Sequence, residues 1–404
     1  MPAESIARRD GRRIVLPGLV SAHSHAFQRG LRGRTQRRSA RGSFWSWRAL
    51  MYRFAERLDP DRIYALSRFA YAELVLSGVT AVGEFHYVHH APDGRPYAER
   101  TAMADAVIRA ARDVGLRISL LRVLYARGGA GRAAEGAQRR FCDRDVDDAL
   151  RDVEALHQRY AADPFVRVGI APHSVRAVPL PWLKAAARYS EERRLPLHIH
   201  VAEQRREIEE CLAEHGRRPV TLLAEEGLVG PRFVAVHGTH LCPAEVRALG
   251  GSFVCVCRST ERDLGDGLPD VTGLVGAGAR LCVGVDSHAS SDAFDELRAV
   301  ELDERTRTEA RTRLDATRLL VAGTRDGAEA IGFGALDDEV ELDANDPALA
   351  GSEDIDADDV VVFVATPRAV RRVRIGGNEV VAEGRLERIE EMRTAYERVL
   401  RDIA

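Results

Sequence analysis

Eight short apolar segments rich in β-branched residues recur along this chain, and longer amphipathic stretches separate them. This alternation is typical of strand–helix units whose strands lie parallel in one sheet. Eight is the number of units that closes a (β/α)8, TIM-like barrel, so the sequence predicts an α/β fold built on such a barrel. The expected strands lie at residues 14–20, 80–85, 118–125, 166–171, 196–201, 233–237, 252–257 and 280–285.

The stretches between these segments predict helices and two large loops. Apolar residues recur at helical spacing at residues 63–76, 102–114, 146–160 and 182–192. Two insertions, at residues 31–59 and 128–145, follow the first and third expected strands. Loops at that end of barrel strands commonly form the substrate pocket, so we expect both insertions to contribute to it.

The C-terminal part of the chain differs from the barrel region in composition and in the pattern of its apolar residues. Acidic loops precede two apolar runs, at residues 360–364 and 370–381, which predict strands of a small separate sheet, and residues 386–403 predict an amphipathic helix. We therefore expect a barrel over residues 14–335 and a small, truncated β-sandwich formed by the chain termini, residues 1–13 and 336–404.

The composition limits the class of protein. Of the 404 residues, 30% are charged and 45% hydrophobic, which is typical of a globular protein, and the formal net charge of -3 offers no basic field for nucleic acid. No segment reaches the roughly 20 apolar residues that span a bilayer, and the N-terminus has no signal-peptide pattern. We expect a cytoplasmic protein whose partner is a small molecule, with no nucleic acid and no membrane.

The six cysteines show no repeating spacing, so we expect buried thiols rather than disulfides. Cys255 and Cys257 could form half of a metal site. They lie within an apolar run, however, and this favours packing in the core.

Polar side chains gather at the C-terminal ends of the expected strands. His23 and His25 follow the first strand, and because they are two residues apart on a strand their imidazoles share a face. Other histidines and acids stand at the ends of the fourth, fifth, sixth and eighth strands: His173, His198, His200, Glu203, His237, His240, Asp286 and His288. Such strand ends meet at one rim, which is the active-site face of these barrels.

Imidazole nitrogens and a carboxylate at one rim favour a divalent transition metal, with zinc as the first expectation and another such metal as the alternative. A single histidine at a strand end is most often a hydrogen-bonded structural residue, but five such ends in one chain favour a metal site. His198 and His200 share a strand face, so spacing alone does not decide which of them is a ligand.

Several motifs together resemble the amidohydrolase superfamily and, within it, the formimidoylglutamate deiminases. The resemblance covers roughly residues 14–335. The motifs that carry it are LPGL at 16–19, HSHAFQR at 23–29, SFWSWRALMY at 43–52, EFHYVHH at 84–90, HIHVAEQ at 198–204, LGDG at 264–267 and DSH at 286–288.

This resemblance implies roles for particular residues. One zinc ion per chain would be bound by His23, His25, His200 and Asp286. The catalytic groups would be Glu203 as proton shuttle, with His237 and Asp286 steadying the developing charge. The substrate pocket would use Gln28, Arg48, Tyr87, His173 and Arg176. Relatives with two metals commonly bridge them by a carboxylated lysine at the end of the fourth strand, where this chain has His173, so the resemblance implies a single metal. It also implies a homodimer.

Two of the pocket residues and one cluster have simpler interpretations. A surface ion pair is the alternative for Arg48, and aromatic packing is the alternative for Tyr87. Glu84, His86, His89 and His90 could form a second metal site, but a loop that shapes the pocket around Tyr87 is favoured.

The implied reaction is hydrolysis of N-formimino-L-glutamate to N-formyl-L-glutamate and ammonia, a step of histidine degradation. It breaks a carbon–nitrogen bond of a linear amidine, with zinc providing an activated water. The two carboxylates of the substrate need cationic partners, and Arg176 can offer a bidentate fork to one of them. The alternatives are another deaminase of the superfamily acting on a nucleobase, hydrolysis of the same substrate to glutamate and formamide, and a catalytically inactive metal-binding barrel.

Overall fold

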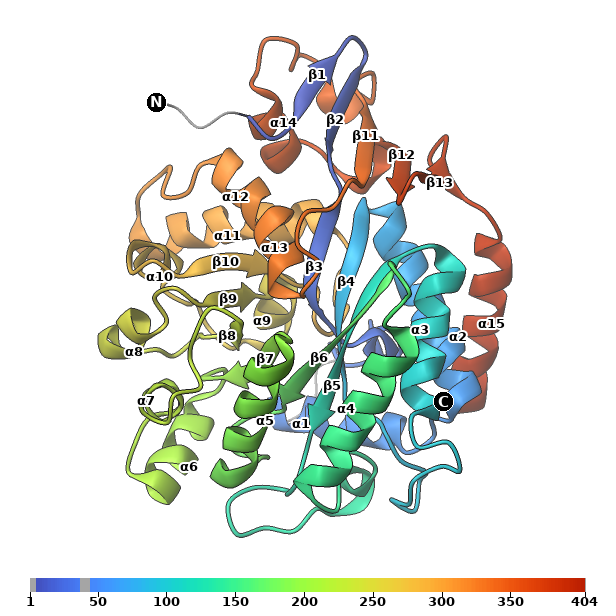
Figure 1. The fold of residues 1–404 in the computed structure, drawn as a ribbon. Coiled ribbons are helices and arrows are strands. Elements are labelled where there is room, and N and C mark those ends of the chain that lie inside the picture. The colour runs from blue at the N-terminus through green and yellow to red at the C-terminus, as the bar shows by residue number, and fades with distance from the viewer. Residues whose placement is uncertain (1–4, 37–43, 404) are drawn as a thin grey trace.

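A computed structural model describes residues 5–36 and 44–403 of the chain. Eight parallel strands follow one another around a nearly closed barrel, in the same order as in the sequence (Figure 1). They are β3 (Leu19–Ser24), β4 (Val79–His86), β5 (Arg117–Leu124), β6 (Val166–Pro172), β7 (Leu197–Val201), β8 (Phe233–His237), β9 (Phe253–Val256) and β10 (Arg280–Val283). The expected barrel is confirmed.

The barrel closes through the residues that follow its first and last strands. Ser24 and Asp286 form a parallel bridge, the His25 N–H donates to the Asp286 carbonyl at 2.8 Å, and the Asp286 N–H donates to the His23 carbonyl at 3.1 Å. The seam of the barrel therefore holds three of the residues expected in the metal site.

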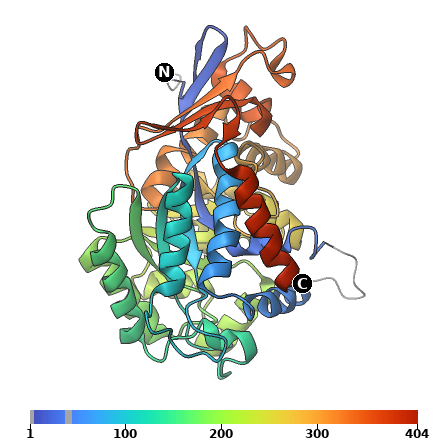
Figure 2. The same ribbon diagram turned by 90° about the vertical axis from the view of Figure 1, so that its right-hand side faces the viewer.

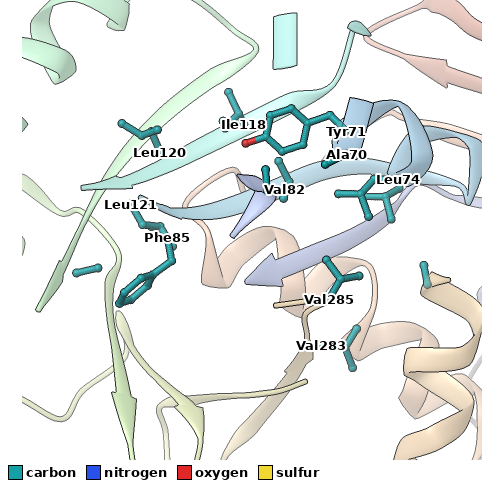
Figure 3. Packing of buried hydrophobic residues seen from close by; sticks show 14 of the residues in the cluster. Ala70, Tyr71, Leu74, Val82, Phe85, Ile118, Leu120, Leu121, Val283 and Val285 are labelled. Carbon is teal, nitrogen blue, oxygen red and sulfur yellow. The ribbon is translucent and has the colours of Figure 1, made fainter. Parts of the chain in front are cut away.

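Helices cover the outside of the barrel. They are α2 (Pro60–Leu76), α3 (Ala102–Val114), α4 (Val146–Tyr160), α5 (Leu180–Arg193), α6 (Arg205–His215), α7 (Pro219–Glu225), α8 (Pro243–Ala248), α9 (Arg258–Leu264), α10 (Val271–Gly276), α11 (Ala293–Thr308), α12 (Ala316–Ala322) and α13 (Arg325–Ala330). Figure 3 shows part of the apolar packing between α2 and strands β4 and β5, where Tyr71, Val82 and Ile118 are fully buried.

The two expected insertions are partly helical. The first carries α1 (Phe44–Ala55), and the second carries the 3-10 helix η2 (Gly136–Arg140). Both contribute side chains to the pocket described below, among them Trp47 and Arg48 from α1 and Phe141, which follows η2.

The chain termini form a second, antiparallel sheet next to the barrel. Its order is β1 (Arg8–Asp10), β2 (Arg13–Pro17), β11 (Glu339–Asp343), β12 (Val370–Ile375), β13 (Asn378–Ala382) and β14 (Arg385–Leu386). The C-terminal helix α15 (Ile389–Ile403) lies beside α2, as Figure 2 shows, and Tyr396 packs on Phe69 with ring centroids 4.7 Å apart.

The strand expected at residues 14–20 is in fact two strands. Residues 13–17 pair with β11 in the small sheet, and the barrel strand begins at Leu19. The chain passes from one sheet to the other at Gly18, where a Cβ atom would lie 2.1 Å from the Thr80 hydroxyl oxygen. Close packing at the crossing therefore requires glycine.

The prediction of a strand at residues 360–364 is wrong. These residues lie in helix α14 (Ala357–Phe363), which starts at Asp356, whose carboxylate accepts from the Asp358 N–H at 2.9 Å. Val360, Val361 and Val362 are fully buried, and the helix packs against α11 and α12. Tertiary burial here overrides the strand propensity of three consecutive valines.

No helix in the described part of the chain has the length and apolar character that crossing a membrane requires. The six cysteines are free thiols.

Candidate active site

Four potential metal ligands meet at the C-terminal rim of the barrel. One ligand atom from each of His23, His25, His200 and Asp286 lies within 4.8 Å of the other three, and all four residues are buried. The Nε2 atom of His23 is 3.2 Å from Nε2 of His25 and 3.1 Å from Nε2 of His200. Oδ1 of Asp286 lies 3.4 and 3.3 Å from Nε2 of His23 and His25.

The hydrogen bonds around this group suit a cation. Nδ1 of His25 donates to the Phe85 carbonyl at 2.9 Å, and Nδ1 of His200 donates to the His173 carbonyl at 3.1 Å. Because a carbonyl only accepts, both neutral rings turn a bare Nε2 lone pair toward His23. Lone pairs this close repel one another unless a cation lies between them, and backbone-oriented histidines of this kind are typical of metal ligands.

Burial also keeps these imidazoles neutral, which metal coordination requires. Desolvation, together with the neighbouring His23, lowers the pKa of His25 to about 3. Desolvation likewise holds the pKa values of His23 and His200 well below the ordinary range.

His198 does not join the group. Its Nε2 lies 2.8 Å from the carbonyl of Ala330, the last residue of α13 (Arg325–Ala330), so the ring is bound to the C-terminal end of this helix. Of the two histidines that spacing left open, the structure brings His200 and not His198 to the other three ligands.

His237 lies beside His23, His25, His200 and Asp286, which we call the metal-donor group, and its ring is oriented by Glu261. Its Nδ1 is 3.1 Å from Oε1 of Glu261, while Nε2 lies 3.8 Å from Oδ2 of Asp286 and 3.9 Å from Oε1 of Glu203. Burial alone would lower the pKa of His237, but the carboxylates of Glu203, Glu261 and Asp286 raise it to about 10.

Glu203 is a largely buried carboxyl group that lines the pocket. Burial raises the pKa of Glu203 to about 8, against the opposing effect of His237. The turn that carries it is held by Glu207, whose carboxylate accepts from the N–H groups of Ala202 and Glu203 at 3.2 and 3.3 Å. A carboxyl group with a pKa near neutrality is suited to proton transfer.

Strained backbone marks the same rim. Ala202, His237, Asp286 and His288 adopt positive φ angles of 54°, 73°, 50° and 55°, a region that non-glycine residues seldom occupy. Such strain concentrates at functional sites, where the surrounding structure enforces it. Of these four residues, His237 and Asp286 line the pocket described below.

A pocket opens above the metal-donor group and contains every residue expected to bind substrate: Gln28, Arg48, Tyr87, His173 and Arg176. The amide of Gln28 donates to the Tyr87 hydroxyl at 2.7 Å, while its Oε1 is buried without a hydrogen-bond partner. Nη1 of Arg176 is also buried without a hydrogen-bond partner. Arg48 is close enough to Arg176 for that charge to contribute to lowering the pKa of Arg48, although burial has the larger effect.

The cluster after β4 has a structural role. Glu84 accepts from the Ser24 hydroxyl at 2.7 Å and from the Ala26 N–H at 2.9 Å, so it holds the turn that carries His25. Nε2 of His89 donates to the Val123 carbonyl at 2.9 Å. In the described residues these side chains form no metal-donor group, and the adjacent buried Arg122 would repel a cation.

Sequence reasoning missed several residues of the site. Glu261 and Glu207 position His237 and Glu203, and Trp47, Met51, Tyr52, Tyr125 and Phe141 line the pocket. For Glu261 and Glu207 a weak signal exists, since they are acids five and six residues after the ends of β9 and β7, but acids on helix surfaces share such spacing. Trp47, Met51, Tyr52 and Phe141 lie in the two insertions expected to form the pocket, but no local signal separates these individual residues, or Tyr125, from core residues.

Comparison with known protein families agrees with this geometry. The model of the Amidohydrolase family matches residues 14–380. The chain belongs to the amidohydrolase family.

Formimidoylglutamate deiminase of Pseudomonas aeruginosa, a curated relative, is 38% identical over 407 aligned residues, which cover 96% of this chain and 89% of the relative. The crystal structure of an amidohydrolase from Brucella melitensis superposes with a TM-score of 0.90 at 34% identity, covering 96% of this chain and 89% of that one. An adenosine deaminase from Xanthomonas campestris, solved with bound zinc, has the same fold, with a TM-score of 0.80 at 23% identity and coverage of 95% and 85%. The expected membership of the amidohydrolase family and the expectation of a hydrolase are therefore confirmed.

Proposed function

We propose that this amidohydrolase hydrolyses N-formimino-L-glutamate to N-formyl-L-glutamate and ammonia, a step of histidine degradation. The observation that carries the proposal is the pocket, which places two guanidinium groups, Arg48 and Arg176, above the metal-donor group. The substrate has two carboxylates and one reacting amidine, so its charges match this arrangement. The 38% identity with a formimidoylglutamate deiminase supports the same substrate.

Arg176 would bind one substrate carboxylate. Its unpartnered, buried Nη1 gives the guanidinium a donor that the protein does not satisfy, and a charged acceptor would satisfy it. Arg48, which lies over the Tyr52 ring at 5.5 Å, would bind the other carboxylate. Gln28 would accept a hydrogen bond at its free Oε1, with Tyr87 holding its amide in place.

His23, His25, His200 and Asp286 would hold one zinc ion per chain. The neutral imidazoles and the carboxylate fit the nitrogen and oxygen ligands that zinc takes in hydrolases. A bound zinc ion supplies an electrophile that lowers the pKa of a coordinated water to about 7.

Proton transfer would be the work of Glu203. This carboxylate would accept a proton from the attacking water as oxygen adds to the formimino carbon, and would give it to the formimino nitrogen. It would then transfer the remaining hydroxyl proton to the same nitrogen, so that the carbon–nitrogen bond breaks, a carbonyl forms and the nitrogen leaves as ammonia. His237, held through Nδ1 by Glu261, presents Nε2 to the same space and steadies the charge that develops on the reacting group. The His173 ring lies tilted beside that of His200, with ring centroids 5.0 Å apart, and would bound the amidine end of the pocket.

The test is metal analysis of the purified protein, followed by an ammonia-release assay on N-formimino-L-glutamate and identification of the second product. We expect one zinc per chain, ammonia, and N-formylglutamate. Formamide with glutamate would instead show cleavage of the other carbon–nitrogen bond. Ammonia from guanine or cytosine, without turnover of the formimino compound, would favour a nucleobase deaminase, and no ammonia from any substrate would favour an inactive barrel.

The expectations of a homodimer and of a cytoplasmic location belong to the same proposal. Light scattering coupled to size-exclusion chromatography tests the first, and fractionation of the source cells tests the second.

A further inference from the structure

We propose that the active site has a second, inhibitory zinc site formed by His237, Cys257 and Asp286. One ligand atom of each lies within 4.8 Å of those of the other two, and all three residues are buried. The inference rests on the proposed function, because Asp286 is shared with the first metal site and His237 takes part in the proposed reaction.

The two carboxylate oxygens of Asp286 face different histidines. Its Oδ1 lies 3.4 and 3.3 Å from Nε2 of His23 and His25, whereas its Oδ2 lies 3.8 Å from Nε2 of His237. The two oxygens are therefore directed to different sets of imidazoles. A carboxylate in this position can bind one cation through each oxygen, as in two-metal hydrolytic sites.

The contact of His237 Nδ1 with Glu261 orients the ring so that Nε2 can bind a metal. Nδ1 is 3.1 Å from the buried carboxylate of Glu261, and this leaves Nε2 to face Asp286 and Glu203. Histidines that bind metals commonly donate the opposite N–H to a carboxylate, which fixes the ring and increases the basicity of the ligand nitrogen. Glu203, with Oε1 at 3.9 Å from His237 Nε2, offers a further oxygen.

Cys257 distinguishes this site from the first. It follows β9 directly, and its N–H donates to Oε1 of Glu261 at 2.9 Å, so its backbone is tied to the carboxylate that orients His237. A thiolate selects zinc over magnesium, calcium or manganese. Metal binding would release the thiol proton to solvent.

Occupation of this site would stop the proposed reaction. A zinc ion on His237 Nε2 removes the group that steadies charge on the substrate, and its positive charge holds Glu203 as a ligand rather than as a proton shuttle. The first zinc would therefore activate the enzyme, and the second would inhibit it.

The test uses Co²⁺ as a probe added to protein that already holds one equivalent of zinc. We expect a second equivalent to bind, a thiolate-to-cobalt charge-transfer absorption to appear in the near ultraviolet, and excess Zn²⁺ to reduce ammonia release. Exchange of cobalt into the first site cannot produce this band, because that site has no sulfur ligand. Cys257→Ala should lose the band and the second equivalent.

Cys282→Ala is the matched control, since Cys282 is also fully buried, on the neighbouring strand β10, but lies outside the donor group. This variant should keep the band. Wild-type protein that binds one equivalent only, or binds a second without a thiolate band, would overturn the inference whatever the variants do. A band with no activity on the formimino substrate would instead contradict the proposed function and leave the second site standing.

Discussion

At the scale of single residues, the site depends on two ionisable groups whose pKa values are both raised by their surroundings, but for different physical reasons. Burial raises the pKa of Glu203 to about 8, and nearby carboxylates raise the pKa of His237 to about 10 although burial opposes this. Two groups whose pKa values differ in this way can serve as acid and base within one pocket. Three substitutions test the residue roles.

Glu203→Gln keeps the size of the side chain but removes its ability to carry a proton. Because general acid–base transfer is worth roughly 10²–10⁴ in rate, we expect kcat to fall by about that factor. Zinc content should not change, because the ligands are untouched. Steady-state kinetics with metal analysis measure both, and near-normal turnover would show that another group moves the proton.

Arg176→Met removes one proposed carboxylate contact from the pocket. A charge-assisted hydrogen bond is worth about 1.5–3 kcal/mol, so KM should rise by roughly 10- to 100-fold with zinc content unchanged. Arg188→Met, on the exposed surface of α5, is the control and should behave as wild type. Unaltered kinetics for Arg176→Met would remove this residue from the binding site.

Glu261→Gln tests a positioning residue. The neutral amide is a weaker acceptor for His237 Nδ1, and loss of a carboxylate behind a functional histidine typically costs roughly 10- to 100-fold in activity. We expect the loss in kcat with little change in KM. Glu245→Gln is a matched buried carboxylate on α8, bound to Arg218 at 2.7 Å and outside the pocket, and should lower stability only. Equal kinetic effects of both variants would mean that Glu261 is merely structural.

At the scale of elements, the site is assembled by strand ends and by the helices that start directly after them. Helix α9 begins one residue after Cys257 and brings Thr260 and Glu261 to the rim, where the Thr260 hydroxyl lies 3.0 Å from that of Ser287. The barrel strands were predictable, because short apolar runs rich in β-branched residues alternate regularly with longer amphipathic stretches. The helix of residues 357–363 was not, because its valines are buried by neighbouring helices rather than by a sheet.

Glu296 of α11 gives a test of this packing through pH. Burial raises its pKa to about 8, while bonds to Ser259, whose N–H it accepts at 3.2 Å, act in the opposite direction. Between the ordinary glutamate pKa of 4.5 and about 8, Glu296 in the folded state holds a proton that it has released in the unfolded state. The free energy of unfolding should therefore decrease as pH rises through this range, by up to about 1.4 kcal/mol per pH unit.

Glu296→Gln should remove that contribution and make stability less dependent on pH. Urea denaturation of wild type and variant at several pH values between these limits measures the difference. Identical pH dependence in the two proteins would show that Glu296 is ionised in the folded state.

At the scale of the whole molecule, a single buried carboxylate joins the barrel to the terminal sheet. Asp338 accepts from Nε and Nη2 of Arg117 on β5 at 2.9 and 3.0 Å, and from the Gly376 N–H in the turn between β12 and β13 at 2.9 Å. Its carbonyl accepts from the Gly18 N–H, at the point where the chain crosses between the sheets.

Asp338→Ala should destabilise the protein by about 3–5 kcal/mol, because it leaves the buried Arg117 guanidinium without its main partner. Asp337→Ala is the matched control: its side chain contacts the same Arg117 at 3.3 Å but is 81% exposed, so we expect a change of less than about 1 kcal/mol. Chemical denaturation measures both, and similar effects of the two substitutions would contradict a special role for Asp338.

The sequence alone determined the barrel and most of the rim chemistry. Strand number follows from local apolar runs, and polar residues at strand ends meet at one rim in any closed parallel barrel. Only the tertiary structure showed that His200, and not His198 on the same strand face, lies close to His23, His25 and Asp286, and that Glu261 lies behind His237. The neighbours of these histidines are set by contacts between segments far apart in the chain, and such contacts cannot be inferred from the local periodicity of the sequence.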